Sequence, residues 1–316
     1  CDDTPAPNGD VFGVVTNGKT KQWNEADVAD IRQDLSGAAI DTHIVYVDDG
    51  NKTGEWSKVI VGDLTTGDPT LLELAAVHED LEAATYSDGW YVLATSLSAI
   101  DNENKQRLTR VRIDSTPAIT DEESVTLRTE VMAAMQAHDA TWYEQWKDEA
   151  SKEGGLNIEG ITRAATDDGR IMYGVRSPKY GANFGNPATN ADYSLDDGVA
   201  IIATVQDPFG TPEVSLMTID LGIHAVRGIE WIPAMNTYVV IGGRSFKASD
   251  YSLWTWDGTD GGGVAALGLE GFDELCRPES VFQETEGDQD YLVVMSEESG
   301  EDCDGAAFTW IKAQVL

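Results

Sequence analysis

The sequence lacks the features that would place it in a membrane or on nucleic acid. Its 316 residues contain no run of about eighteen apolar side chains, the length that spans a bilayer. Basic residues are scarce, with 21 Lys and Arg against 56 Asp and Glu, which gives a net charge of −35. Such a surface repels phosphate backbones and anionic headgroups, so we expect no nucleic-acid partner and membrane contact only through a lipid anchor. The charge fits either divalent-cation binding or adaptation to salty surroundings, and the second explanation is the simpler one.

Catalytic signatures are also missing. There is no Gly-x-Ser-x-Gly elbow, no His-Glu-x-x-His or Cys-x-x-Cys cluster and no glycine-rich phosphate loop after a strand. The four histidines are widely separated along the chain. The sequence therefore offers no catalytic residue, and we expect a protein without catalysis, although an enzyme is not ruled out.

Cysteine is rare, and its three positions are informative. Cys1 is followed by a polar stretch containing Pro5, Pro7 and Gly9, which is similar to the start of a mature bacterial lipoprotein. The alternative is a chain that merely begins at this residue. We expect residues 1–9 to form a tether that holds the protein in the cell envelope, in the periplasm or at the cell surface. Cys276 and Cys303 remain as an even pair, which predicts a disulfide in an oxidising compartment.

Five short segments in order share one pattern, a polar lead-in and a Glu or Gly beside a small residue, followed by an apolar strand start. They lie at residues 34–39, 80–84, 157–161, 226–230 and 277–281. The first four are each followed by three further β-rich runs, at 43–48, 58–63 and 70–75; 90–96, 107–113 and 124–127; 170–176, 198–205 and 213–221; and 237–242, 252–256 and 264–269. Four strands per unit predict the blades of an all-β propeller.

The fifth unit is one strand short, because only residues 279–283, 290–296 and 306–313 read as strands before the chain ends. Residues 10–16 form an apolar run without a partner in the first unit. We therefore predict a single domain over residues 10–316, a five-bladed propeller whose N-terminal strand closes the last blade. Six blades are the alternative if two short blades have been merged.

A helical insertion interrupts the repeat at about residues 128–152. Val131, Met135, Trp142 and Trp146 recur there at helical spacing, with His138 on the same face. We predict one helix lying across the propeller rim, and a lid over the channel is the alternative.

Residues 155–161 (GLNIEGI), 172–178 (MYGVRSP) and 227–230 (RGIE) resemble motifs of a bacterial β-propeller family of unknown function. That family is related to the domains called esterase-like activity of phytase. The sequence departs from its pattern at Val175 and Ser177, where the family has Leu and Gly. The resemblance implies a propeller and no established activity.

The repeat predicts a set of side chains around the propeller axis, where first strands line the channel. Four carboxylates converge there, with Ser36 in the remaining blade: Glu82, Glu159, Glu230 and Glu279. They either hold Ca²⁺, which takes six to eight oxygens, or pair with the basic residues of the channel mouth, Arg176, Arg227, Arg244 and Arg277. The Trp residues of the strands, including Trp231, Trp254, Trp256 and Trp310, are expected to pack between blades.

These features predict a lipid-anchored, secreted propeller that binds an unidentified protein or small ligand at its channel face. A calcium-dependent hydrolase of phosphoesters or esters, acting through the channel carboxylates, is the first alternative. A structural subunit of a surface layer or filament is the second.

Overall fold

The fold was determined as a computed structural model that describes residues 11–20, 35–48, 58–62, 69–166, 168–184, 194–246, 250–297 and 308–316. Within these residues, twenty strands form five antiparallel sheets of four strands each. Blade 1 contains β2 (Leu35–Ile40), β3 (Ile44–Asp48), β4 (Lys58–Gly62) and β5 (Thr70–Glu73). Blade 2 contains β6 (Leu81–Ser87), β7 (Trp90–Thr95), β8 (Arg107–Ile113) and β9 (Ile119–Thr126). Blade 3 contains β10 (Asn157–Arg163), β11 (Ile171–Tyr180), β12 (Val199–Gln206) and β13 (Glu213–Ile219).

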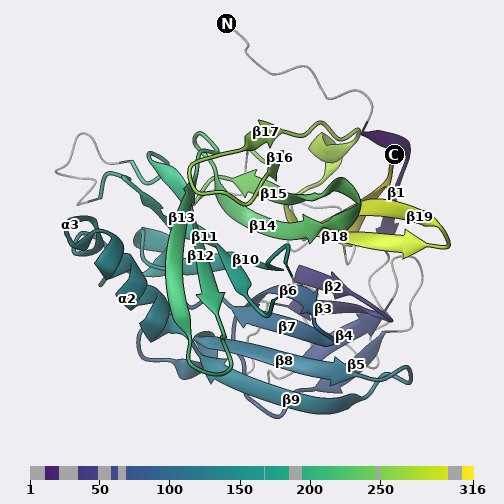
Figure 1. Cartoon of the computed structure of the whole chain (residues 1–316), viewed down its shortest axis with the longest axis horizontal. Coiled ribbons are helices and arrows are strands. Elements are labelled where there is room, and N and C mark those ends of the chain that lie inside the picture. The colour runs from purple at the N-terminus through teal and green to yellow at the C-terminus, as the bar shows by residue number, and fades with distance from the viewer. Residues whose placement is uncertain are drawn as a thin grey trace, which may run out of the picture.

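Blade 4 contains β14 (Ala225–Ile232), β15 (Thr237–Gly243), β16 (Ser252–Trp256) and β17 (Val264–Ala266). Blade 5 contains β18 (Pro278–Glu286), β19 (Gln289–Glu297), β20 (Phe308–Val315) and β1 (Phe12–Thr20). The innermost strands β2, β6, β10, β14 and β18 contact one another in turn, and β18 contacts β2, so the ring is closed (Figure 1). The predicted five-bladed propeller is confirmed.

The predicted closure of the last blade is also confirmed. β1 pairs antiparallel with β20, with Thr16 opposite Lys312 and Gly18 opposite Trp310. The first and last strands of the described chain thus share one sheet, and β20 has a partner on both of its edges.

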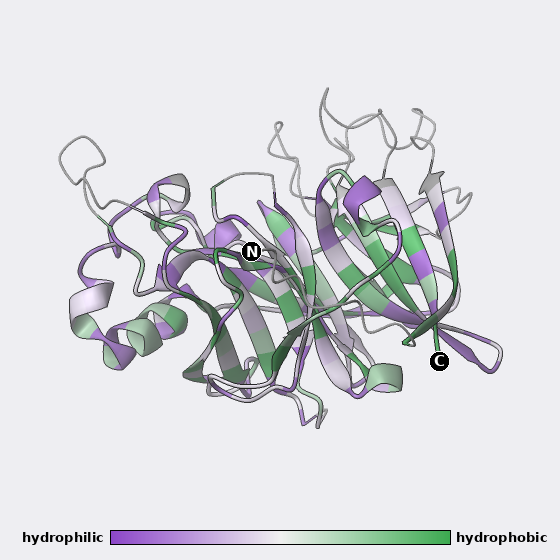
Figure 2. Cartoon of the chain, turned by 90° about the horizontal axis from the view of Figure 1, so that it is seen from above, coloured by the Kyte–Doolittle hydropathy of each residue, from purple (hydrophilic) through white to green (hydrophobic). Residues whose placement is uncertain are grey.

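The strands form because both faces of each blade are buried. In β3, Ile44 and Tyr46 belong to the apolar cluster shared with blade 5, while Val45 and Val47 belong to the cluster shared with blade 2. Five such clusters fill the five interfaces between neighbouring blades. The central strands are consequently continuous apolar runs in the sequence. Figure 2 shows hydrophobic residues along the strands and hydrophilic ones in the connections.

The insertion after β9 is helical but contains a break. It forms α2 (Arg128–His138) and α3 (Ala140–Tyr143), separated by Asp139, whose carboxylate accepts hydrogen bonds from the backbone N–H groups of Thr141 and Trp142. The predicted helical insertion is confirmed, and Asp139 divides it, because this residue adopts an extended backbone and caps a second, shorter helix.

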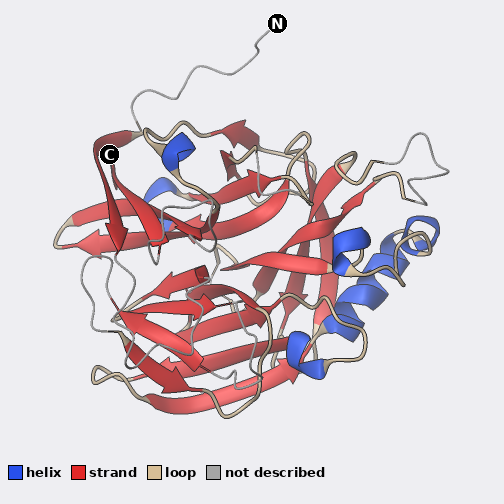
Figure 3. Cartoon of the chain, turned by 180° about the vertical axis from the view of Figure 1, so that it is seen from behind, coloured by secondary structure: helices blue, strands red, loops and turns tan. Residues whose placement is uncertain are grey.

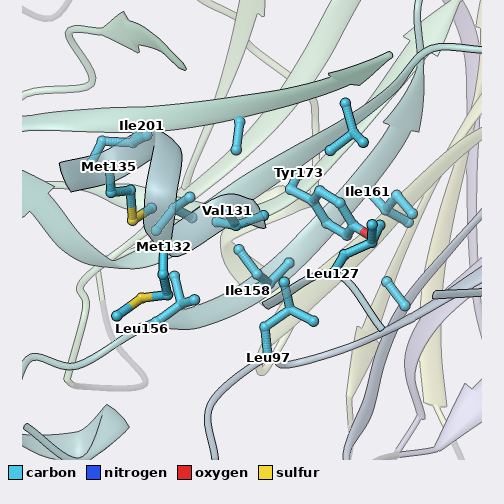
Figure 4. Packing of buried hydrophobic residues seen from close by; sticks show 14 of the residues in the cluster. Leu97, Leu127, Val131, Met132, Met135, Leu156, Ile158, Ile161, Tyr173 and Ile201 are labelled. Atoms are coloured by element: carbon cyan, nitrogen blue, oxygen red, sulfur yellow. The ribbon is translucent and has the colours of Figure 1, made fainter. Parts of the chain in front are cut away.

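α2 contacts β13, the outermost strand of blade 3, so the helix lies at the rim as expected (Figures 1 and 3). Val131 and Met135 are buried beside Ile158 and Ile201 of blade 3 (Figure 4). Trp142 and Trp146 are buried in the same cluster, whereas His138 is exposed and packs edge-on against Tyr180, with ring centroids 4.9 Å apart.

Two predictions based on cysteine concern residues that the structure does not describe. Cys1 and its tether, and Cys303, lie outside the described residues, so the lipid anchor and the pairing with Cys276 stay predictions. No helix in the described residues is long and apolar enough to cross a membrane.

Candidate functional site

Each innermost strand carries a β-bulge at the same place, and this bulge is what the sequence repeat encodes. At each bulge the pairing register skips one residue, which leaves that residue unpaired in the ladder. The five unpaired residues are Ser36, Glu82, Glu159, Arg227 and Glu279. All five are buried at the hub of the propeller.

A small residue follows every bulge because the next blade comes very close there. A Cβ on Gly228 would lie 2.4 Å from the carbonyl oxygen of Glu279, and a Cβ on Gly37 would lie 2.6 Å from the Cα of Ala83. Both contacts are to backbone atoms of the neighbouring blade, which cannot move aside as a side chain would. The small residue therefore permits the close packing of innermost strands that forms the hub.

Arg227 holds two of the bulge carboxylates together across three blades. Its Nη1 lies 2.5 Å from Oε2 of Glu159 and 3.1 Å from Oε1 of Glu279. Arg176 also pairs with Glu159, and its Nε donates to the carbonyl oxygen of Ser245 at 2.5 Å. Burial would raise the pKa of Glu159, but the Arg176 and Arg227 guanidiniums outweigh it and hold that pKa below its ordinary value. Burial would likewise lower the pKa of Arg227, and the two carboxylates raise it instead.

The structure separates one member of the predicted carboxylate set from the others. Glu82, Glu159 and Glu279 occupy the bulge position, whereas Arg227 takes this position in blade 4 and Glu230 lies three residues further along β14. A guanidinium thus stands where a cation bound by Glu159 and Glu279 would sit. Within the described residues, no group of three or more His, Cys, Asp or Glu side chains is arranged to hold a metal ion.

The structure gives different contacts for the other two predicted basic residues, Arg244 and Arg277. Arg244 pairs with Asp250 at 2.6 Å and with Asp196 at 3.0 Å. Arg277 lies just before β18, and its backbone N–H donates to Oγ of Ser296 at 2.9 Å. Arg176 and Arg227 each pair with Glu159, one of the repeat glutamates.

Glu230 occupies a second layer of the channel. Its Oε2 accepts a hydrogen bond from Oγ1 of Thr85 at 2.8 Å. Thr85 is in blade 2 and Glu230 in blade 4, which are not neighbours, so this bond crosses the channel. Glu230 is only 8% exposed. Burial raises its pKa to about 8, against smaller opposing effects of the Thr85 hydrogen bond and the Arg163 charge. The carboxyl is therefore mostly protonated at neutral pH and can donate a hydrogen bond as well as accept one.

A pocket of about 340 Å³, here called the mouth pocket, lies at the hairpin end of the channel, and Glu230 is one of its lining residues. Four residues after each bulge, every innermost strand contributes one side chain to it: Ile40, Tyr86, Arg163, Trp231 and Gln283. All five blades therefore build this pocket. The sequence analysis assigned none of these residues to a binding site, although their constant spacing from the repeat is a signal that identifies them.

A second pocket of about 320 Å³, here called the side pocket, lies between blades 2 and 3 and shares Ser87 and Asp88 with the mouth pocket. Arg110 lies in its wall between two aromatic rings, with Cζ 4.6 Å from the Trp90 centroid and 4.3 Å from the Phe209 centroid. The same guanidinium pairs with Glu123 at 2.5 Å. The charge of Arg110 is thus already neutralised within the protein.

The four tryptophans expected between blades all contact apolar interface clusters. Trp256 is fully buried, and Trp231, Trp254 and Trp310 pack against the clusters while partly exposed. Trp231 also lines the mouth pocket, so it has a second environment that the prediction did not include.

Comparison with known proteins shows the fold and not a family. No family model and no curated protein matches the chain. Among solved structures, an exo-β-1,3-galactanase from Clostridium thermocellum aligns at 10% identity with a TM-score of 0.52, over 94% of this chain and 62% of the galactanase. The WD40 repeats of RRP9 align at 12% identity and a TM-score of 0.39, over 89% of this chain and 67% of that one. The Pan2 WD40 domain of Neurospora crassa aligns at 10% identity and a TM-score of 0.38, over 88% of this chain and 74% of that one. The chain is a β-propeller, distantly similar in fold to the galactanase.

Proposed function

We propose that the protein is a ligand-binding propeller and that its ligand occupies the mouth pocket. The observation that carries this proposal is the contribution of one side chain from the same position of all five blades. A pocket built in this way is held by the whole ring, so its shape does not depend on a single loop. Pockets of this size that combine apolar walls with a few polar groups are where proteins commonly bind small molecules.

The lining favours an uncharged polar ligand. The protonated carboxyl of Glu230 offers one donor and one acceptor, and the rings of Tyr86 and Trp231 offer apolar surface. An anionic ligand would approach against a net charge of −35. The same lining would accept the uncharged end of a larger molecule.

The lipid anchor and the location in the cell envelope are part of this proposal. They rest on Cys1 and the polar residues 2–9 that follow it. A tether of this composition would hold the propeller close to a membrane while leaving the mouth pocket accessible. The resemblance to the propeller family of unknown function is compatible with this and adds no activity.

The two alternatives have less support. A calcium-dependent hydrolase would need free carboxylates at the hub, but Arg227 lies between Glu159 and Glu279, and Glu230 lies in another layer. A filament subunit would need a surface for repeated contacts with further copies, and no feature described above provides one.

A thermal-shift screen with small neutral amides, polyols and sugars tests the proposal. A ligand that binds only the folded form at a hundredfold excess over its Kd adds about 2.7 kcal/mol to the free energy of unfolding. We expect such a shift in the wild-type protein and in Trp254→Ala, whose ring lies in the same blade but outside the pocket, and its loss in Trp231→Ala. A shift that survives in Trp231→Ala would place the ligand elsewhere.

A further inference from the structure

The mouth pocket does not end at the channel. It adjoins the side pocket at Ser87 and Asp88, the tip of the hairpin between β6 and β7. Asp88 is exposed, and its carboxylate makes no hydrogen bond or ion pair with another described residue. Two pockets of about 340 and 320 Å³ thus meet at an available carboxylate. A ligand that fills both must be elongated.

The side pocket has the same mixed chemistry as the mouth pocket. Phe209 contributes apolar surface, and Gln206 and Asp207 contribute hydrogen-bonding groups. The cation of Arg110 is engaged by Glu123 and by two aromatic rings, so it is not available for a phosphate or carboxylate of a ligand. This chemistry suits a chain whose units carry both hydroxyl groups and apolar C–H faces.

The strand arrangement argues against a peptide as this chain. Extended peptides gain affinity by pairing with the free edge of a sheet. The side pocket is lined mainly by β7, β8, β11 and β12, each of which is already paired on both edges, and β6 contributes only its last residue, Ser87. The lining therefore offers side chains and hairpin tips rather than a backbone edge.

On these grounds, and resting on the proposed function of the mouth pocket, we infer that the ligand is a neutral oligosaccharide. Its terminal unit lies in the mouth pocket, and the following units pass over Ser87 and Asp88 into the side pocket. The terminal unit meets Trp231 and the Glu230 carboxyl, and later units meet Gln206 and Phe209. No bond is made or broken in this binding.

Isothermal titration with neutral β-linked gluco-, galacto- and manno-oligosaccharides of increasing length tests the inference. We expect affinity in one series to rise by about tenfold or more between the single sugar and chains that reach the side pocket, which corresponds to about 1.4 kcal/mol. Phe209→Ala and Gln206→Ala should each reduce this gain with length. Trp254→Ala, which is outside both pockets, should keep it.

The outcomes separate this inference from the proposed function. Single sugars that bind without any gain for longer chains would overturn the elongated ligand and leave the mouth pocket as the binding site. If no saccharide binds while other neutral compounds bind in a Trp231-dependent way, the saccharide class is wrong. Saccharide binding that is unchanged in Trp231→Ala would contradict the proposed function itself.

Discussion

Arg227 is the residue that most directly joins the blades at the hub. It is almost fully buried, and both carboxylates that it contacts are buried as well. A buried ion pair gains little over an apolar replacement of all its members, because removing charges from water is costly. Removing a single member has a different effect, since the remaining charges stay buried without compensation.

We therefore expect Arg227→Met to lower the free energy of unfolding by about 3–5 kcal/mol, because Glu159 and Glu279 lose their shared partner. Arg244→Met is the matched control. Arg244 pairs with Asp196 and Asp250 but is 28% exposed, so its loss should change stability by about 0–1 kcal/mol. Urea unfolding of both variants measures the difference, and equal effects would contradict the role given to Arg227.

Glu230 should make stability fall as pH rises. Its folded-state pKa of about 8 lies above the ordinary value of 4.5, so the unfolded chain releases this proton first. The stabilising contribution of Glu230 to the free energy of unfolding is complete below about pH 4.5. It is lost between about pH 4.5 and 8, at up to roughly 1.4 kcal/mol per pH unit. Glu230→Gln should remove this slope.

Urea unfolding at several pH values between 5 and 8 gives the free energy of unfolding of wild type and of Glu230→Gln. The difference between the two should change with pH. The exposed Glu213 supplies the control, since Glu213→Gln should leave the wild-type slope unchanged. A pH-independent difference between wild type and Glu230→Gln would show that Glu230 is ionised in the folded protein.

The hub shows how far the sequence predicts individual residues. The repeat identified Glu82, Glu159 and Glu279 correctly as equivalent positions, because each precedes a small residue at a bulge. In blade 4 the same place is held by Arg227, and the nearby Glu230 was grouped with the others because its residue type matched. A pattern based on residue type cannot detect that a bulge position has changed charge. The bulge itself is visible only in the pairing of strands.

At the scale of elements, the innermost strands are shaped by their contact with the next blade. The bulge bends each strand, and the following small residue lets the neighbouring backbone approach. The requirement is most severe at Gly228, where a Cβ would overlap a carbonyl oxygen.

Gly228→Ala should lower the free energy of unfolding by about 1–3 kcal/mol, because the backbone of blade 5 must move away from blade 4. Gly62→Ala is the control, since its Cβ would lie 3.6 Å from the ring of Tyr46, an ordinary contact. We expect this variant to stay within about 0.5 kcal/mol of wild type. Comparable losses in chemical denaturation would mean that strand propensity, and not the approach of blade 5, explains the glycine.

The inserted helix α2 contributes to the core through one face. Met135 is fully buried and its neighbour Gln136 is exposed. Met135→Ala should destabilise the protein by about 2–5 kcal/mol, whereas Gln136→Ala should change stability by less than about 0.5 kcal/mol. Thermal or urea unfolding measures both, and a small effect of Met135→Ala would indicate that α2 is not part of the cooperative core.

Elements were predicted well where apolar runs are bounded by turn residues, as for β8 and β16, whose bounds match the expected ones. The prediction was less accurate where tertiary contacts decide. β9 begins at Ile119, five residues before its expected start, because its polar residues Asp121, Glu122 and Glu123 pair along β8. The helix break at Asp139 was missed because the apolar spacing continues through it.

The whole molecule is a ring whose last blade combines strands from both ends of the described chain. β20 would present an open edge in blade 5 if β1 were absent, and open edges of sheets promote self-association. The strand that covers this edge comes from the opposite end of the described chain.

Protein lacking residues 1–20 should therefore associate into dimers or larger species, as measured by size-exclusion chromatography with light scattering. Protein lacking only residues 1–9 keeps β1 and should behave as the full chain does. A monomer of unchanged stability without residues 1–20 would show that blade 5 does not need its fourth strand.

The pairing of β1 with β20 also constrains the order in which the fold can form. Thr16 and Lys312 are partners in the sheet although 296 residues separate them along the chain. Blades 1 to 4 are each built from strands that follow one another, whereas blade 5 combines β1 with β18, β19 and β20. Contacts so distant along the chain form slowly, because a long loop must close before they contribute. Blades 1 to 4 should therefore assemble as an open arc before blade 5 is completed.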